Sequence, residues 1–211
     1  MELLRAIRKN SDSEVKLLLK SGFNPNILVQ EYDNKMQIYY NTIPLCVAAA
    51  NGYVQIARSL IKHGADINAN NNAWSSPLHL ATYCGHESMI KMLIMKNANI
   101  NLRDSRGNTA LHEACRMSRV GCVALFLKYN VDLNVRNNDF KTAFDLAEEK
   151  KSKTIINLLK TRLNDKKKAY MSIYKTDKND VKNVSKKNVR FHEEVTMIRD
   201  ECGLVKKGGY S

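Results

Sequence analysis

One short phrase recurs in this chain at a constant spacing, and that spacing limits the folds that the chain can adopt. The phrase occupies residues Ile43–Ala48, Ser76–Ala81, Thr109–Ala114 and Thr142–Ala147. Its starts, at 43, 76, 109 and 142, are each 33 residues apart. A second phrase keeps the same step through residues 64–68, 97–101 and 130–134. Because self-similarity at a fixed step of this length is the signature of stacked repeats, we expect a solenoid.

The residues within one repeat predict two helices and a turn. Ser76 can cap a helix, and Pro77 suits its first turn because the missing amide would have had no partner there. Apolar residues at helical spacing then predict a second helix from Glu87 to about Lys96. Asn97 follows it, in the place that Gly64 holds one repeat earlier, and both residue types tolerate the left-handed conformation that ends helices.

These phrases resemble the ankyrin repeat, whose period and Thr-Pro-Leu-His-x-Ala pattern they match. The resemblance covers residues 1–160 and implies an all-α solenoid of helix-turn-helix repeats with β-hairpin loops. It also implies an interaction protein, an adaptor or scaffold, because stacked repeats form binding surfaces far more often than active sites. Thus we expect no enzyme activity, no cofactor and no metal site.

The repeat phrase sets the predicted domain boundaries. Five repeats are expected at about residues 1–26, 39–71, 72–104, 105–137 and 138–160. An inserted loop at residues 27–42 separates the first two repeats. Residues 161–211 lack periodicity and are rich in Lys, Asn, Asp and Ser, so they are predicted to form a basic, mostly disordered tail.

Composition narrows the class of protein. The five cysteines are odd in number and contain no Cys-x-x-Cys pair, which is typical of free thiols in a reducing compartment. No signal peptide or apolar run of membrane-spanning length is present in the sequence. The chain is therefore expected to be cytoplasmic, with nuclear entry through Lys166–Lys168 as the alternative. A net charge of +13 favours acidic partners, but its even spread and an aromatic content of 7% disfavour nucleic acid.

The fourth position of the phrase carries residues that could suggest a metal or catalytic site: Cys46, His79, His112 and Asp145. Equivalent residues in neighbouring repeats lie about 8–10 Å apart, whereas zinc needs ligands at about 2.0–2.3 Å. In the ankyrin family, this histidine ties the turn to the helix by hydrogen bonds. These four residues are therefore expected to be structural.

The candidate binding residues of the array are basic. Arg103, Arg106 and Arg136 lie on the tips of the last two predicted loops, and Arg116 lies on the neighbouring short helix. The ankyrin resemblance implies that loop tips and inner helices form a concave binding face. Since Arg can bind carboxylates through two parallel hydrogen bonds, an acidic protein segment is the expected ligand; a merely solvated charged face is the alternative.

Two aromatic residues replace the glycine that this family places two residues before the Thr. Gly107 keeps the pattern, but Trp74 and Phe140 occupy the equivalent positions. A bulky residue does not tolerate positive φ, so both substitutions are expected to alter their turns. Exposed rings at these places would be partner anchors. Alternatively, each ring folds back onto its own hairpin.

One tail segment resembles the docking motif of protein phosphatase 1 partners. Lys187, Val189 and Phe191 fill its basic and apolar positions. In an added edge strand, Val189 and Phe191 would point to one face and enter paired apolar pockets. The resemblance implies a targeting or inhibitory subunit of protein phosphatase 1, with its catalytic subunit as partner. The competing hypothesis is an ankyrin-type inhibitor or cofactor of a transcription or signalling regulator.

Overall fold

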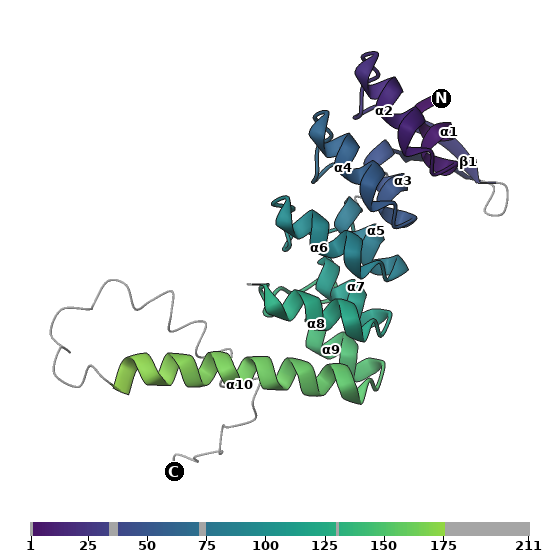
Figure 1. Cartoon of the computed structure of the whole chain (residues 1–211). Coiled ribbons are helices and arrows are strands. Elements are labelled where there is room, and N and C mark those ends of the chain that lie inside the picture. The colour runs from purple at the N-terminus through teal and green to yellow at the C-terminus, as the bar shows by residue number, and fades with distance from the viewer. Residues whose placement is uncertain (1, 34–37, 72–74, 130, 176–211) are drawn as a thin grey trace, which may run out of the picture. The chain divides into compact units, whose positions relative to one another are not determined.

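The structure is a computed structural model that describes residues 2–33, 38–71, 75–129 and 131–175. It divides into two units, residues 1–162 and residues 163–211, and the boundary lies within the last described helix. The first unit confirms the predicted all-α repeat solenoid (Figure 1). No helix in the described part of the chain is both long and apolar enough to cross a membrane.

The described residues form ten helices, two in each of the five predicted repeats. They are α1 (Glu2–Arg8), α2 (Asp12–Lys20), α3 (Pro44–Ala50), α4 (Val54–Lys62), α5 (Pro77–Cys84), α6 (Glu87–Met95), α7 (Ala110–Arg116), α8 (Val120–Lys128), α9 (Ala143–Glu149) and α10 (Lys153–Lys175). The first helices of the repeats stack on one another in chain order from α1 to α9. The second helices stack beside them from α2 to α8 (Figure 1).

One alanine per repeat lets the first helices approach closely. Each of these alanines is fully buried: Ala6, Ala48, Ala81, Ala114 and Ala147. A methyl side chain leaves room for the neighbouring helix, which a larger residue at the same step would push away. The core is completed by larger side chains, of which Phe126 is the biggest that is fully buried.

The backbone conformations at the turns between helices are those that the residue types predict. Gly64 and Asn97 adopt φ values of 91° and 65°, so the left-handed conformation predicted at the ends of α4 and α6 is confirmed. Gly85, with φ 82°, ends α5 and donates its backbone N–H to Thr82 O. In the last repeat, where sequence shows no glycine between the two helices, Lys151 takes the left-handed conformation instead (φ 54°).

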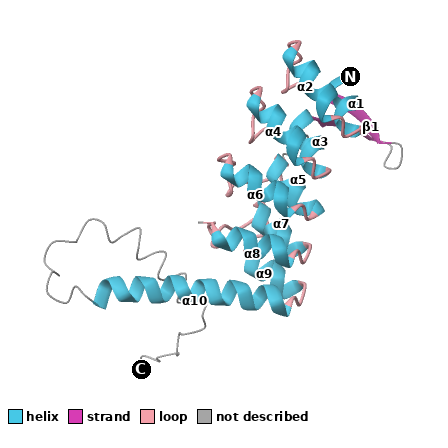
Figure 2. Cartoon of the chain, in the orientation of Figure 1, coloured by secondary structure: helices cyan, strands magenta, loops and turns pink. Residues whose placement is uncertain are grey.

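The inserted loop of the sequence prediction contains a β-hairpin. Strands β1 (Val29–Asp33) and β2 (Ile38–Thr42) are antiparallel, with Val29 opposite Thr42 and Asp33 opposite Ile38. The segment is rich in Tyr, Ile, Val and Thr, which favour strands. In the described residues, these are the two strands of the fold (Figure 2).

The first part of the predicted tail is helical, because α10 continues to Lys175, and the first unit ends at Arg162, two residues after the predicted boundary at residue 160. Ile155 and Leu159 are buried and anchor the first turns of α10 to the array. The helix can then propagate, since each further residue adds one backbone hydrogen bond without a new nucleus. Residues 176–211 lie outside the described residues.

Candidate functional site

The fourth residue of the repeated phrase connects the second, third and fourth repeats each to the next one. His79 Nε2 donates to Asn108 O at 3.0 Å, and His112 Nε2 donates to Lys141 O at 3.1 Å. Cys46 makes the equivalent contact more weakly, with Sγ at 3.7 Å from Ser75 O. The prediction that these residues are structural agrees with this geometry, since each holds the backbone of the following hairpin.

Each histidine also caps its own helix. His79 Nδ1 lies 3.3 Å from the backbone N of Ser76 and 2.8 Å from its Oγ, and His112 bonds to Thr109 in the same way. Because Nδ1 accepts the backbone N–H, the ring proton is assigned to Nε2, and the imidazole is neutral. Burial lowers the pKa of His79 and His112, while the accepting carbonyl opposes that shift.

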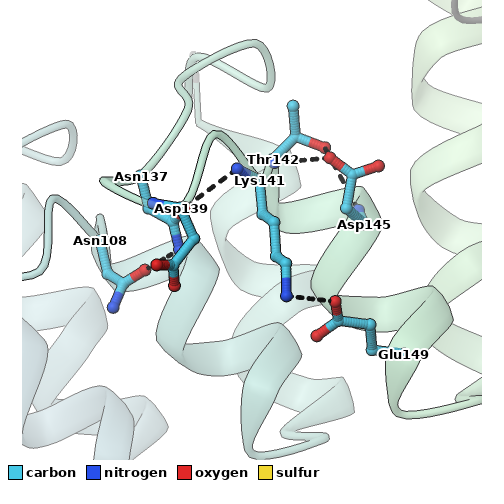
Figure 3. A network of polar contacts seen from close by, with 7 residues as sticks. All are labelled: Asn108, Asn137, Asp139, Lys141, Thr142, Asp145 and Glu149. Carbon is cyan, nitrogen blue, oxygen red and sulfur yellow. Dashed lines mark hydrogen bonds and ion pairs between the residues drawn. The ribbon is translucent and has the colours of Figure 1, made fainter.

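Asp145 occupies the position of His79 and His112 in the last repeat. Its Oδ2 accepts hydrogen bonds from Thr142 N at 2.7 Å and Thr142 Oγ1 at 2.8 Å, so it caps α9 as the histidines cap their helices (Figure 3). A carboxylate has no N–H with which to hold a following hairpin. The inter-repeat connection therefore ends at residue 145.

The last two hairpin turns have the same backbone geometry. Gly107 N donates to Asp104 O at 2.9 Å, and Phe140 N donates to Asn137 O at 3.0 Å. Gly107 has φ 74° and Phe140 has φ 59°. The expectation that Phe140 alters its turn is therefore wrong: the ring is accepted at positive φ, at a cost of about 1–2 kcal/mol.

The neighbouring hairpin explains why glycine is needed at one position and phenylalanine is accepted at the other. A Cβ atom on Gly107 would lie 2.9 Å from the backbone N of Asn138, in the next hairpin. No further hairpin follows Phe140 in the described part of the chain. Its side chain is 79% exposed, so the alternative of a ring folded back onto its own hairpin is wrong for Phe140.

Residues 102–108 and 135–141, which we call the paired hairpins, are joined by a set of polar contacts. Asn138 N donates to Arg106 O at 3.0 Å, and Asn138 Nδ2 donates to Ser105 O at 3.1 Å. Asn137 Nδ2 donates to Asn108 Oδ1 at 2.9 Å in a buried contact (Figure 3). These bonds fix the two loop tips relative to each other.

The predicted basic residues have different roles in the paired hairpins. Arg103 Nε donates to Gly107 O and its Nη2 donates to Arg136 O, both at 3.0 Å. Arg136 Nη1 donates to Phe140 O at 2.8 Å. Arg103 and Arg136 are exposed, but their guanidinium groups are engaged in these hydrogen bonds, which stabilise the two loops. Arg106 is also exposed, and no described residue pairs with its guanidinium.

Arg116 and Lys141, beside the paired hairpins, are held by ion pairs. Arg116 binds Glu113 with both oxygens engaged, at 2.9 Å and 2.5 Å, and this hydrogen bonding raises the pKa of Arg116. Lys141 Nζ lies 2.5 Å from Glu149 Oε1 (Figure 3). Their charges are partly neutralised, which leaves Arg106 and the Phe140 ring as the groups most available to a partner.

The remaining predicted site residues lie outside the described residues. These are Trp74 in the preceding hairpin and the tail residues Lys187, Val189 and Phe191. Sequence reasoning missed Asn138, Asn137 and Glu113. Asn138 and Asn137 could have been found by aligning the two hairpins at the 33-residue step. In that alignment, Asn137 is equivalent to Asp104 and Arg136 to Arg103.

The described His, Cys, Asp and Glu side chains are the groups that could hold a metal ion. Among the residues the structure describes, no three His, Cys, Asp or Glu side chains are grouped to hold a metal ion. Cys46, Cys84, Cys115 and Cys122 are free thiols. Burial raises the pKa of Cys46 and Cys115 to about 12, so both stay protonated and unreactive.

Comparisons with known proteins agree with the repeat geometry. A family model described as ankyrin repeats, in three copies, matches residues 3–104 and residues 78–169. The chain is also similar to an ankyrin repeat protein of Rickettsia bellii (strain RML369-C), with 32% identity. That match covers 37% of this chain and 39% of the relative, so it spans less than half of the relative's length.

Proposed function

The chain belongs to the ankyrin repeat family, and from this premise we propose that it is a non-enzymatic adaptor whose paired hairpins bind an acidic segment of a partner protein. Repeats of this family are protein-protein interaction modules. The observation that carries the proposal is the Phe140 ring, held exposed at positive φ on the hairpin that Asn138 N joins to Arg106 O of the preceding one. Backbone strain that persists at an exposed site is typical of ligand-binding positions.

Preorganisation supports the same surface. The hydrogen bonds of Arg103, Arg136 and Asn138 fix the paired hairpins before any partner arrives. A partner then loses less conformational freedom on binding, since the loop tips need no further ordering. An acidic segment suits the surface, because Arg106 can pair with its carboxylates while Phe140 contacts its apolar side chains.

Poly-L-glutamate is a defined probe for the electrostatic part of this proposal. Replacing Arg106 by Glu is expected to weaken its binding to the full chain roughly fivefold, because one exposed ion pair contributes up to about 1 kcal/mol. Fluorescence anisotropy at constant ionic strength measures the change. Lys91→Glu, an equal charge change at an exposed position on α6, is the control, and an equal loss in both variants would reject the paired hairpins as the site.

The second part of the proposal is that the tail recruits protein phosphatase 1 through Lys187, Val189 and Phe191. Its support is the sequence pattern alone, in a stretch of the tail with few large apolar residues. Val189→Ala with Phe191→Ala is expected to abolish capture of the purified catalytic subunit. The far-UV circular dichroism should stay unchanged, since neither residue belongs to the array. Undiminished capture by the double variant would remove the phosphatase from the proposal and leave the array's function standing.

A further inference from the structure

The first repeat has an apolar surface at positions that the later repeats bury wholly or in part. Leu17 on α2 is 68% exposed, whereas the equivalent Ser59 and Met92 are 7% and 2% exposed and Leu125 is half-buried. Phe23 is 37% exposed, whereas the equivalent Ala65 and Val131 are buried. The period thus identifies Leu17 and Phe23 as members of a stacking surface, which we call the N-terminal flank.

The direction of this surface follows from one contact. Ser59 Oγ, at the position equivalent to Leu17, donates to Asp12 Oδ1 of the preceding repeat at 3.3 Å. A side chain at this position therefore points toward whatever precedes its own repeat. For Leu17, that is the side of the first repeat on which the structure describes no further repeat.

The backbone of the first repeat is open at the same end. In the second, third and fourth repeats, an Asn side chain of the repeat before accepts one loop N–H. Asn26 Oδ1 accepts from Asp66 N at 2.8 Å, Asn68 Oδ1 from Asn99 N at 2.8 Å, and Asn101 Oδ1 from Asp132 N at 3.1 Å. The equivalent N–H in the first repeat belongs to Asn24, and no described residue accepts it. The N-terminal flank thus combines exposed apolar side chains with an unused donor.

We propose that the N-terminal flank is a homodimer interface, in which a second copy of the chain pairs its own N-terminal flank with this one about a twofold axis. The charges on α2 support a second copy. Glu14, Leu17 and Lys20 follow each other at three-residue spacing, on one side of the helix. When two such helices meet antiparallel at Leu17, each Glu14 lies opposite the partner's Lys20, so the surface complements itself.

The other end of the array argues for this arrangement over head-to-tail stacking. Asp145 has no N–H for a following hairpin, and Glu148 exposes negative charge on α9. A second copy placed there would meet a closed, charged end. Pairing through the N-terminal flanks instead gives a closed dimer, with no free flank left for further growth.

Sedimentation velocity of the full chain, at concentrations from about 1 µM to about 1 mM, tests the association. We expect a reversible monomer–dimer equilibrium. Leu17→Lys should weaken it about tenfold or more, because the axis places two added charges against each other. Met95→Lys is the matched control, since Met95 is 66% exposed on α6, and its dimer should be unchanged. Far-UV circular dichroism verifies that both variants stay folded.

A charge exchange tests the antiparallel register. Glu14→Lys and Lys20→Glu should each weaken the dimer, because each places like charges opposite one another across the axis. The double variant Glu14→Lys with Lys20→Glu should restore the dimer to within about twofold of the original dissociation constant. A chain that stays monomeric throughout the concentration range, a dimer that tolerates Leu17→Lys, or a double variant without recovery would each overturn the proposal.

Discussion

Replacing His79 by Ala is expected to lower the free energy of unfolding by about 3 kcal/mol. The variant loses the hydrogen bond to Asn108 O, in the next repeat, and the acceptor that His79 Nδ1 provides for the Ser76 N–H. The Ser76 N–H is then left buried without a protein partner, whereas Asn108 O keeps only the hydrogen bond from Asp104 N at 2.8 Å. An unsatisfied buried polar group costs about 1–3 kcal/mol, which makes this loss large for a single side chain.

Equilibrium unfolding of the full chain in urea measures this change. His63→Ala is the control, because His63 bonds within its own helix, through Nδ1 to Ser59 O, and holds no other repeat. We expect the control to lose less than about 1 kcal/mol. Similar losses in both variants would show that the connection between repeats contributes little to stability.

The same histidines should make stability depend on pH. Burial lowers the pKa of His79 and His112 below the ordinary value of 6.5. The unfolded chain therefore binds these protons at a higher pH than the folded one does. The stabilisation is present above pH 6.5 and is lost as the pH falls below it, through the folded pKa values. Unfolding curves of the native chain should show this decline, and His79→Ala should show a smaller one.

Substitutions at the two hairpin turns, Gly107→Ala and Phe140→Gly, should change the free energy of unfolding in opposite directions. Gly107→Ala is expected to destabilise the fold by about 2–3 kcal/mol. The added Cβ meets the backbone N of Asn138 at 2.9 Å, and the residue must still adopt φ 74°. Neither strain can relax without moving the next hairpin.

Phe140→Gly should instead stabilise the fold by about 1 kcal/mol, because glycine accepts φ 59° without strain. The gain is smaller than the full strain, since glycine also makes the unfolded chain more flexible. Little apolar burial is lost, because the ring is 79% exposed. Thermal unfolding of the two variants beside the native chain tests the pair, and a lower melting temperature for Phe140→Gly would refute the assigned strain.

The repeat step alone was enough to predict the helices and their capping residues. Ser76, Thr109 and Thr142 recur at that step, and each begins a helix, because local hydrogen bonding determines where helices start. The structural role of His79 and His112 followed from the family resemblance. These features could be predicted because they repeat.

Features that do not repeat were harder to predict. Phe140 was expected to change its turn, since propensity alone disfavours a bulky residue at positive φ. The bonds of Arg136, Asn137 and Asn138 override that preference, and they depend on which hairpin follows which. The length of α10 could not be deduced from the end of the repeat phrase, because a helix can continue after its repeat has ended.

The residue at the fourth position of the phrase also constrains how this protein can change in length. A copy of the third or fourth repeat, inserted between them, would bring its own histidine and a hairpin carbonyl for its neighbour. A copy of the fifth would place Asp145, which has no donor, inside the array, and would break the chain of bonds at that point. An extra copy of an interior repeat therefore continues the series of inter-repeat hydrogen bonds, whereas an extra copy of the fifth repeat interrupts it.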